Sequence, residues 1–301
     1  MRYEKFEEEV IKRVQEIVGS SGSVRVNDVR KNNNILLRGM IVLRDGQNVS
    51  PTIYLNSFYE MLKEGMDLEV VVRKILELYV GSLSRSKVDM EFFKDFEQVK
   101  NQIVYRLINR EKNKELLADI PHVDFLDLAI CFYYSFWHPE IGEGAILIHN
   151  SHLEMWNVEA GILMPLANLN TPRLMPARFC TIDEALSGVL DEEQSAELQK
   201  LQQESGKYLY VLSNIKCCNG AAVILYPGML ETVARRLRSS FYLLPSSIHE
   251  TLLLCDDGKS NSEDLHMMIA DINGSQIREE EVLSDYAYHY DAATGRLVET
   301  H

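Results

Sequence analysis

One short polar segment of the chain has the residue types of a hydrolytic site. Ser246, Ser247 and His249 stand together in the stretch FYLLPSSIHETLLL, between two apolar runs. A serine hydroxyl becomes a nucleophile when a histidine takes its proton and an acidic residue from elsewhere orients the ring. The structural alternative is a turn, because Pro245 fixes φ and short hydroxyls bond nearby backbone. We expect the turn, and we keep hydrolysis at these three residues as an alternative function.

A strand is expected to follow this turn, over residues 248–254. Neighbouring residues of a strand point to opposite faces of the sheet. His249 and Glu250 are therefore expected to face apart, so that they would not act together on one substrate.

Two adjacent cysteines occupy a second polar segment, SNIKCCNGA. A thiol at Cys217 or Cys218 becomes reactive where a nearby cation or a helix N-terminus lowers its pKa, and Lys216 is adjacent. The Asn-Gly pair that follows is a strong hairpin signal, so we expect a turn here. The five cysteines include no Cys-x-x-Cys pair, which indicates a reducing compartment without a disulfide framework.

The histidines of HNSHLE are the weak candidates for a metal site. His149 and His152 would share a face in a helix, but this stretch is expected at the end of a strand; His138 could add a third ligand. Zinc needs three or four ligands, and the sequence has neither His-Glu-x-x-His nor a spaced cysteine set. Phosphate loops and dinucleotide-binding glycine motifs are also missing from the sequence. We therefore expect solvated loop histidines, no metal and no cofactor.

A basic hairpin is the remaining candidate for a binding surface. It carries five cations, Arg25, Arg30, Lys31, Arg38 and Arg44. Such a surface could bind an acidic protein partner or the phosphates of a nucleic acid. The aromatic residues that single-strand binding uses for stacking do not alternate with these charges. Basic strand edges also protect a sheet against edge-to-edge pairing, which is the structural alternative.

Length and composition are those of an ordinary globular protein. The chain has 301 residues, 46% of them hydrophobic and 25% charged, which suits two domains of usual size. The net charge of −14 argues against a protein that coats nucleic acid. No stretch approaches the ~18 consecutive apolar residues of a membrane span, and the first residues lack the apolar centre of a signal peptide. We expect a cytoplasmic protein that does not bind membranes.

Hydrophobic spacing predicts an α+β fold with a small N-terminal unit over residues 1–85. A charged amphipathic helix comes first, and a three-stranded meander and two more helices follow. Asn56 and Asp67 are the expected caps of those two helices. The predicted strands are residues 24–29, 35–43 and 51–55.

A larger α+β body is expected over residues 116–301, joined to the first unit by a bridging helix within residues 86–115. The apolar positions of residues 89–110 keep the spacing of a helix. An acidic helical insertion is predicted over residues 183–206. Two Gly-Ala segments, at residues 144 and 220, are each predicted as a strand after a turn, so an internal duplication of the body is one interpretation.

The chain also resembles a known family through a set of motifs that spans nearly its whole length. These motifs are SPTIYLNSFYEMLKEG, HVDFLDLAICFYY, ANLNTPRLMPA, YVLSNIKCCNGAAVILYPG, LLPSSIHETLLL and VLSDYAYHYDAATGRL. They are similar to those of an uncharacterised bacterial family of about this length, known only as a domain of unknown function. The resemblance implies an intracellular bacterial protein. It implies no reaction and no catalytic residues.

The first functional hypothesis from the sequence is a non-enzymatic interaction or regulatory protein with a protein partner. It depends on the acidic body and on two local basic patches, the basic hairpin and the cluster of Arg235, Arg236 and Arg238. Hydrolysis at the serine-histidine segment is one alternative, and nucleic-acid binding through the basic hairpin is the other.

Overall fold

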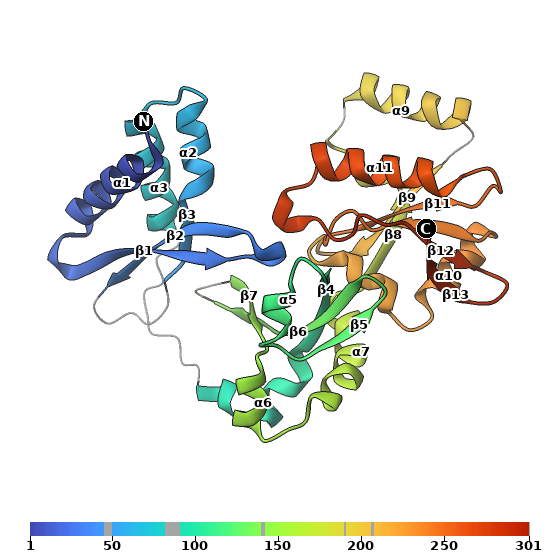
Figure 1. Ribbon diagram of the computed structural model, residues 1–301, viewed down its shortest axis with the longest axis horizontal. Coiled ribbons are helices and arrows are strands. Elements are labelled where there is room, and N and C mark those ends of the chain that lie inside the picture. Colours follow the sequence, from blue (N-terminus) through green and yellow to red (C-terminus); the bar gives the residue numbers. More distant parts are fainter. Residues whose placement is uncertain (45–49, 82–90, 140–141, 190, 206–207, 301) are drawn as a thin grey trace. The chain divides into compact units, whose positions relative to one another are not determined.

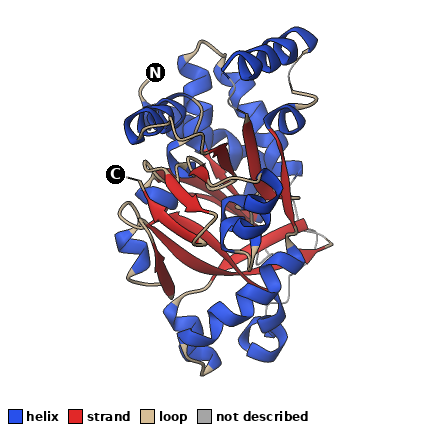
Figure 2. Ribbon diagram, turned by 90° about the vertical axis from the view of Figure 1, so that its right-hand side faces the viewer, coloured by secondary structure: helices blue, strands red, loops and turns tan. Residues whose placement is uncertain are grey.

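The computed structural model describes residues 1–301 except 45–49, 82–90, 140–141, 190, 206–207 and 301. The chain forms two compact units. The first unit is Met1–Lys94 with Phe136–Gly144, and the second is Asp95–Ser135 with Ala145–His301. Helices and antiparallel strands are mixed in the chain (Figure 2), which confirms the predicted α+β class.

The first unit is a three-stranded antiparallel sheet with helices packed on it (Figure 1). The strands follow the order β1–β2–β3. Apolar residues of α1, α2 and α3 pack with residues of β2 and β3 in one core, which includes Phe6, Val10, Met40 and Ile75. The predicted helix, meander and two helices are therefore confirmed. Their bounds are α1 Tyr3–Val18, β1 Gly22–Arg30, β2 Leu36–Arg44, β3 Thr52–Tyr54, α2 Leu55–Lys63 and α3 Leu68–Gly81.

One of the two predicted helix caps in this unit is wrong. Asp67 does cap α3, because its Oδ1 accepts a hydrogen bond from the Glu69 amide at 2.8 Å. Asn56 lies inside α2, which begins at Leu55. Its Oδ1 instead accepts a hydrogen bond from the Arg38 amide of β2 at 2.8 Å. The asparagine therefore ties a helix to the sheet.

The second unit contains two sheets. The four-stranded sheet has the order β4–β6–β5, and β7 also pairs with β6; the six-stranded antiparallel sheet has the order β13–β12–β10–β11–β9–β8. Helix α11 packs on the larger sheet (Figure 1) through Leu265 and Ile269, which join a core with Leu244, Leu254 and Ala287. The strands are β4 Ile103–Asn109, β5 His122–Phe125, β6 Leu128–His138, β7 Gly142–Leu147, β8 Ala177–Thr181, β9 Leu209–Asn214, β10 Phe241–Leu244, β11 Thr251–Cys255, β12 Tyr288–Asp291 and β13 Arg296–Glu299.

The remaining elements are short helices, apart from α7, α9 and α11. The α-helices are α4 Phe96–Val99, α5 Lys114–Leu117, α6 Asn150–Trp156, α7 Leu163–Leu174, α8 Ile182–Leu186, α9 Glu192–Ser205, α10 Met229–Leu237 and α11 Ser262–Ser275. The 3-10 helices are η1 Gly19–Ser21, η2 Asn32–Asn34, η3 Glu91–Lys94, η4 Lys100–Gln102, η5 Ala160–Ile162, η6 Gly220–Leu225 and η7 Glu279–Glu281. Helices α8 and α9 occupy the predicted acidic insertion.

The helix predicted over residues 89–110 is wrong in its second half, and residues 82–90 lie outside the described part. Short helices cover Glu91–Gln102 with one gap, and Ile103–Asn109 is a strand that pairs with β6 along its whole length. All but one of its seven residues are buried. A strand buried on both faces has no clear period, so it fits a helical spacing as well as an extended one. The partner strand decides between them.

The second Gly-Ala segment is also different from its prediction. Gly144 lies in strand β7, as expected, but Gly220–Leu225 is the 3-10 helix η6. Gly220 allows this close packing, because a Cβ there would collide with the Ser213 Oγ and with the His249 carbonyl oxygen. The two segments therefore adopt different conformations, and the internal duplication remains a prediction.

Candidate functional site

The serine segment is a buried corner of backbone. Ser246 and Ser247 are only 4% and 2% exposed. The Ser246 carbonyl accepts a hydrogen bond from the Leu283 amide at 2.9 Å, and Ser247 forms a β-bridge with Val282. The Ser247 Oγ accepts a hydrogen bond from the His249 amide at 3.0 Å. These are the contacts of a turn that is joined to the segment around residue 282.

His249 and Glu250 lie before the strand and not in it, because β11 begins at Thr251. The prediction of a strand from residue 248 is therefore wrong, and so is its use to set the two side chains on opposite faces. The Ile248 amide donates instead to the Glu281 carbonyl at 2.9 Å. This bond draws the chain away from the ladder, which begins only three residues later.

The ring of His249 lies between a thiol and a carboxylate. Its Nδ1 accepts a hydrogen bond from the Asn219 amide at 3.3 Å, and its Nε2 lies 3.3 Å from the Glu281 Oε1. It also shares a hydrogen bond with the sulfur of Cys218. The acidic partner that a catalytic histidine needs is therefore present, and its nucleophilic neighbour is a cysteine.

The contacts with Cys218 and Glu281 favour the charged form of the histidine, and those with Arg278 and His249 favour the charged form of the glutamate, whereas the hydrogen bond from Asn219 needs an unprotonated Nδ1. The hydrogen bond with Cys218 raises the pKa of His249 most, burial opposes this rise, and Glu281 adds to it. Burial alone would raise the pKa of Glu281, but hydrogen bonds from Arg278 and His249 lower it overall. An imidazolium next to a sulfur stabilises the thiolate.

The two cysteines lie in a tight turn, residues 214–220, which we call the cysteine turn. Asn214 holds it, because its Nδ2 donates to the Cys218 carbonyl at 2.8 Å and its Oδ1 accepts from the Lys216 amide at 2.9 Å. Cys217 and Asn219 have φ of 49° and 51°, a left-handed conformation that turns the chain sharply. Both thiols are exposed. The expected turn is therefore present, and it presents both sulfurs at the surface.

Each sulfur of the cysteine turn accepts a hydrogen bond from a different donor. The side-chain amide Nδ2 of Asn219 donates to the Cys218 sulfur at 3.6 Å. The Nη1 of Arg178, from β8, donates to the Cys217 sulfur at 3.8 Å. Hydrogen bonds that stabilise a negative sulfur are typical of reactive cysteines.

A mainly apolar cavity of about 310 Å³ opens next to Cys217. Arg178 and Glu250 also line it, and burial raises the pKa of Glu250. The size and lining suit a small organic group. Its apolar walls come from α8, β9 and β11, namely Ile182, Ala185, Leu186, Val211 and Leu252.

The histidines of HNSHLE cap a helix and do not form a metal site. The stretch follows the end of strand β7, as expected, and its residues after His149 begin helix α6. The His149 Nδ1 lies 2.6 Å from the Asp119 Oδ2, and the His149 amide donates to the His152 Nδ1 at 3.1 Å. Burial and the neighbouring His149 lower the pKa of His152. Across the described residues, no three His, Cys, Asp or Glu side chains are arranged to hold a metal ion.

Four of the five cations of the basic hairpin have contacts within the first unit. Arg38 forms ion pairs with Glu7 at 2.7 Å and with Asp28 at 2.8 Å. The other three contacts are Lys31 over the Tyr54 ring, Arg44 over the Tyr79 ring, and a hydrogen bond from Arg30 to Asn34. Arg25 is exposed. Most of this charge is therefore used inside the unit.

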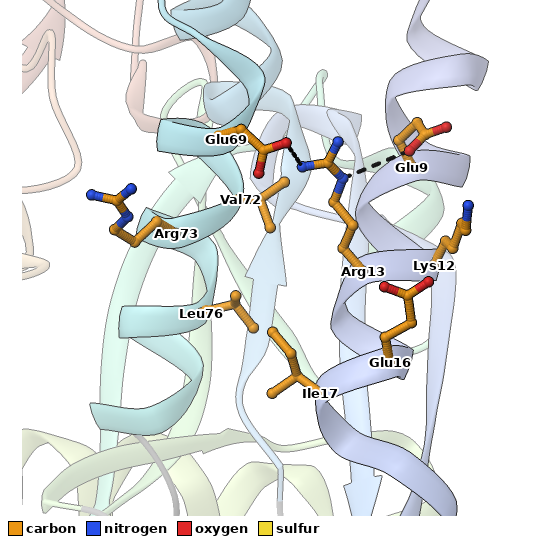
Figure 3. Close-up of a pocket in the computed structure, with 9 residues that line it drawn as sticks. All are labelled: Glu9, Lys12, Arg13, Glu16, Ile17, Glu69, Val72, Arg73 and Leu76. Atoms are coloured by element: carbon orange, nitrogen blue, oxygen red, sulfur yellow. Dashed lines mark ion pairs between the residues drawn. The ribbon is translucent and has the colours of Figure 1, made fainter.

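The first unit also has a groove of about 550 Å³ between α1 and α3 (Figure 3). Arg13 reaches across it to form an ion pair with Glu69, and a second with Glu9 at 3.6 Å. The side chains of Ile17 and Leu76 point between the two helices (Figure 3). The residues that line the groove include no cysteine, histidine or serine. Its chemistry is therefore that of paired charges and apolar packing.

Sequence reasoning missed three members of the site around Cys218. Glu281 lies in a run of three glutamates, a pattern typical of a solvated face. Arg178 carried no signal beyond its type, and Asn219 was expected only as part of the Asn-Gly turn and not as a donor to the sulfur. Only the packing of residues 279–284 against residues 245–248 brings Glu281 to His249, and no local spacing could reveal that.

Comparisons with known proteins identify a family and no activity. The model of a family described as "Family of unknown function (DUF5688)" matches residues 3–292. No curated protein matches the chain, and no solved structure matches it either. None of the helices in the described part of the chain combines the length and the apolar character needed to cross a membrane.

Proposed function

Because the chain belongs to the DUF5688 family of unknown function, we propose its activity from geometry alone: it is a thiol enzyme that performs acyl transfer, with Cys218 as the nucleophile. One observation carries this proposal. The exposed sulfur of Cys218 contacts the ring of His249, and the other side of that ring faces Glu281. Nucleophile, base and orienting acid in this order are the parts of a cysteine triad.

The reaction begins with transfer of the Cys218 proton to His249. The thiolate attacks the carbonyl carbon of an ester, thioester or amide and forms a tetrahedral adduct. When the adduct collapses, the bond to the leaving group breaks and the leaving group takes the proton from His249. Water then attacks the acyl-thioester while His249 accepts its proton, and the acid product leaves as this proton returns to the sulfur.

The other side chains of the site have positioning roles. The Glu281 carboxylate holds the imidazole and stabilises its charged form, and Arg278 in turn holds Glu281. The side-chain amide of Asn219 donates to the sulfur of Cys218, which becomes negative in the reaction. Orienting partners of this kind commonly fix the tautomer and direction of a catalytic histidine.

The cavity next to Cys217 is the proposed binding site for the acyl group. It opens from the cysteine turn, and its apolar walls suit a short hydrocarbon chain. This proposal keeps the base of the predicted hydrolase and replaces its nucleophile. Ser247 already serves the backbone of His249, whereas Cys218 contacts the ring.

Acylation by 4-nitrophenyl acetate tests the proposal. We expect a burst of 4-nitrophenolate, and an acetyl group on Cys218 by peptide mass spectrometry. Cys218→Ala should lose both signals. The matched controls are Cys217→Ala, which removes the adjacent thiol, and Ser247→Ala, which removes the predicted hydroxyl; both should keep them.

Two results would overturn the proposal. One is an acetyl group that persists at the same rate in Cys218→Ala. The other is a wild-type chain that reacts no faster than a cysteine-containing peptide.

A further inference from the structure

Arg106 lies at the centre of β4 with its side chain among apolar residues. Its strand partner is Cys131, and its neighbours on the same face are Val104 and Ile108, which are 3% and 0% exposed. Its guanidinium stacks 4.0 Å from the centre of the Tyr133 ring. The residue is half-buried, so part of it remains accessible.

This guanidinium has no carboxylate partner among the described residues. Its Nε is buried and has no hydrogen-bond partner. Burial lowers the pKa of Arg106 to about 10, so the group stays charged at neutral pH. A half-buried cation without a carboxylate partner is costly to keep, and the contact with Tyr133 offsets only part of that cost. Such a group is typical of a site that binds an anion.

The charge of this cation also acts on the cysteine turn. The sulfurs of Cys131 and Cys218 are the groups that interact with its charge. Cys131 is fully buried, and burial raises its pKa to about 12, so it remains a neutral thiol. The turn also contacts the apolar residues around Arg106 through Met175. Asn214 contacts both Cys218 and the sulfur of Met175. Met175 in turn packs against the buried cluster that includes Val104, Ile108, Cys131 and Tyr133.

We propose that Arg106 binds a carboxylate of the substrate, so that the enzyme acts on acyl groups that carry a second, anionic end. This inference rests on the proposed function, since it places that end near Cys218. The planar guanidinium offers parallel N–H donors, including the unpaired Nε, that match a carboxylate. A singly charged group suits the apolar surroundings better than a phosphate dianion, which loses more hydration energy on entry.

The first experiment compares two 4-nitrophenyl esters in the full-length chain, the neutral acetate and the anionic hemisuccinate. We expect Arg106→Met to lower kcat/KM for the hemisuccinate roughly 10- to 100-fold, the usual effect of a lost charged hydrogen bond, and to lower it for the acetate by a clearly smaller factor, because the charge that acts on Cys218 is lost for both esters. Arg106→Lys should recover part of the loss. An equal fall for both esters would assign Arg106 to the scaffold and overturn the inference.

The second experiment tests anion binding without any reaction. Succinate should raise the Tm of the wild type and of Cys218→Ala, but not that of Arg106→Met. Inorganic phosphate is the matched probe and should give the smaller shift. If succinate binds through Arg106 while Cys218 takes no acetyl group, the proposed function fails and the anion site stands. If no anion shifts the Tm of the wild type, the anion site fails whatever the acylation shows.

Discussion

Two arginines of the first unit and Arg106 of the second differ in how their charge is balanced. In the first unit, Arg13 and Arg38 each form ion pairs with two carboxylates. In the second unit, Arg106 forms none among the described residues; its guanidinium lies over the Tyr133 ring, and its charge acts on the sulfurs of Cys131 and Cys218. Paired surface charges stabilise a fold modestly and need no other purpose. An arginine without a carboxylate partner among the described residues costs stability, and its charge acts on the exposed thiol of Cys218, so the second unit is where function is expected.

The largest expected effect is on the reactivity of Cys218 when His249 is changed. We expect His249→Gln to slow alkylation of Cys218 by iodoacetamide at pH 7 by about 10- to 30-fold, because the base and the positive neighbour of the sulfur are both lost and only a few per cent of an ordinary thiol is ionised at this pH. In the wild type the rate should already be high below the ordinary cysteine pKa of about 8.5. In the variant it should rise only near that pH. Intact-mass kinetics over a pH series measure both curves.

Cys217 is the internal control in the same experiment. It has the same exposure and lies in the same turn, but it contacts Arg178 and not His249. Its alkylation should therefore be unaffected by His249→Gln. If both cysteines slow equally, the variant has disturbed the whole turn, and the comparison between the units loses its support.

The next effect is structural and concerns how the site is held. Gly220→Ala should lower the free energy of unfolding by about 1–3 kcal/mol, because the new methyl group overlaps the Ser213 Oγ and the His249 carbonyl oxygen. Gly274→Ala is the matched control, since a Cβ there meets nothing within 4 Å and α11 should gain slightly. Urea denaturation measures both. Equal stability of the two variants would show that the cysteine turn is not tightly packed.

The site also marks the limit of what the sequence could predict. Amphipathic helices such as α1 and the hairpin of β1 and β2 were predicted, because their periodicity is local. Strand β4 was not, since its burial on both faces imitates a helix until its partner β6 is known. Within the site, the Cys217–Cys218 turn was predicted from Asn-Gly. Glu281 and Arg106 were not predicted, because their roles depend on tertiary packing. Packing brings Glu281 to His249, and it leaves Arg106 without a carboxylate partner among the described residues.

Replacing one arginine from each unit should change stability in opposite directions. Arg38→Met breaks ion pairs with Glu7 and Asp28 and should destabilise the chain by about 0.5–1 kcal/mol, since these pairs are partly exposed. Arg106→Met replaces an unpaired cation by an apolar chain of similar length and should stabilise the ligand-free protein by about 1 kcal/mol. Thermal unfolding at one ionic strength compares them. A loss of stability in both variants would contradict the contrast drawn between the units.

The ion pair of His249 and Glu281 should make a small contribution to stability that depends on pH. The raised pKa of His249 means that its share is present below the ordinary 6.5 and is lost as pH rises through the folded value. The lowered pKa of Glu281 means that its share is present above the ordinary 4.5 and is lost as pH falls. The free energy of unfolding of the wild type should therefore exceed that of Glu281→Gln most between pH 4.5 and 6.5, by less than about 1 kcal/mol. A difference that grows above pH 8 would show that the pair does not form.

The smallest effect on stability is expected at Arg25, and this residue separates the remaining hypotheses about the basic hairpin. It is exposed, so Arg25→Glu should leave the free energy of unfolding within about 0.5 kcal/mol of the wild type. Arg38→Glu should lose its ion pairs and be less stable, which makes it the matched variant for a charge used by the fold.

Because four of the five cations already have contacts within the unit, we expect no shift of duplex DNA by the wild type at physiological salt. A DNA shift that Arg25→Glu abolishes at unchanged stability would restore the nucleic-acid hypothesis. Capture of an acidic protein that is lost in the same variant would assign the hairpin to a protein partner, so that binding and catalysis would lie in different units of the chain.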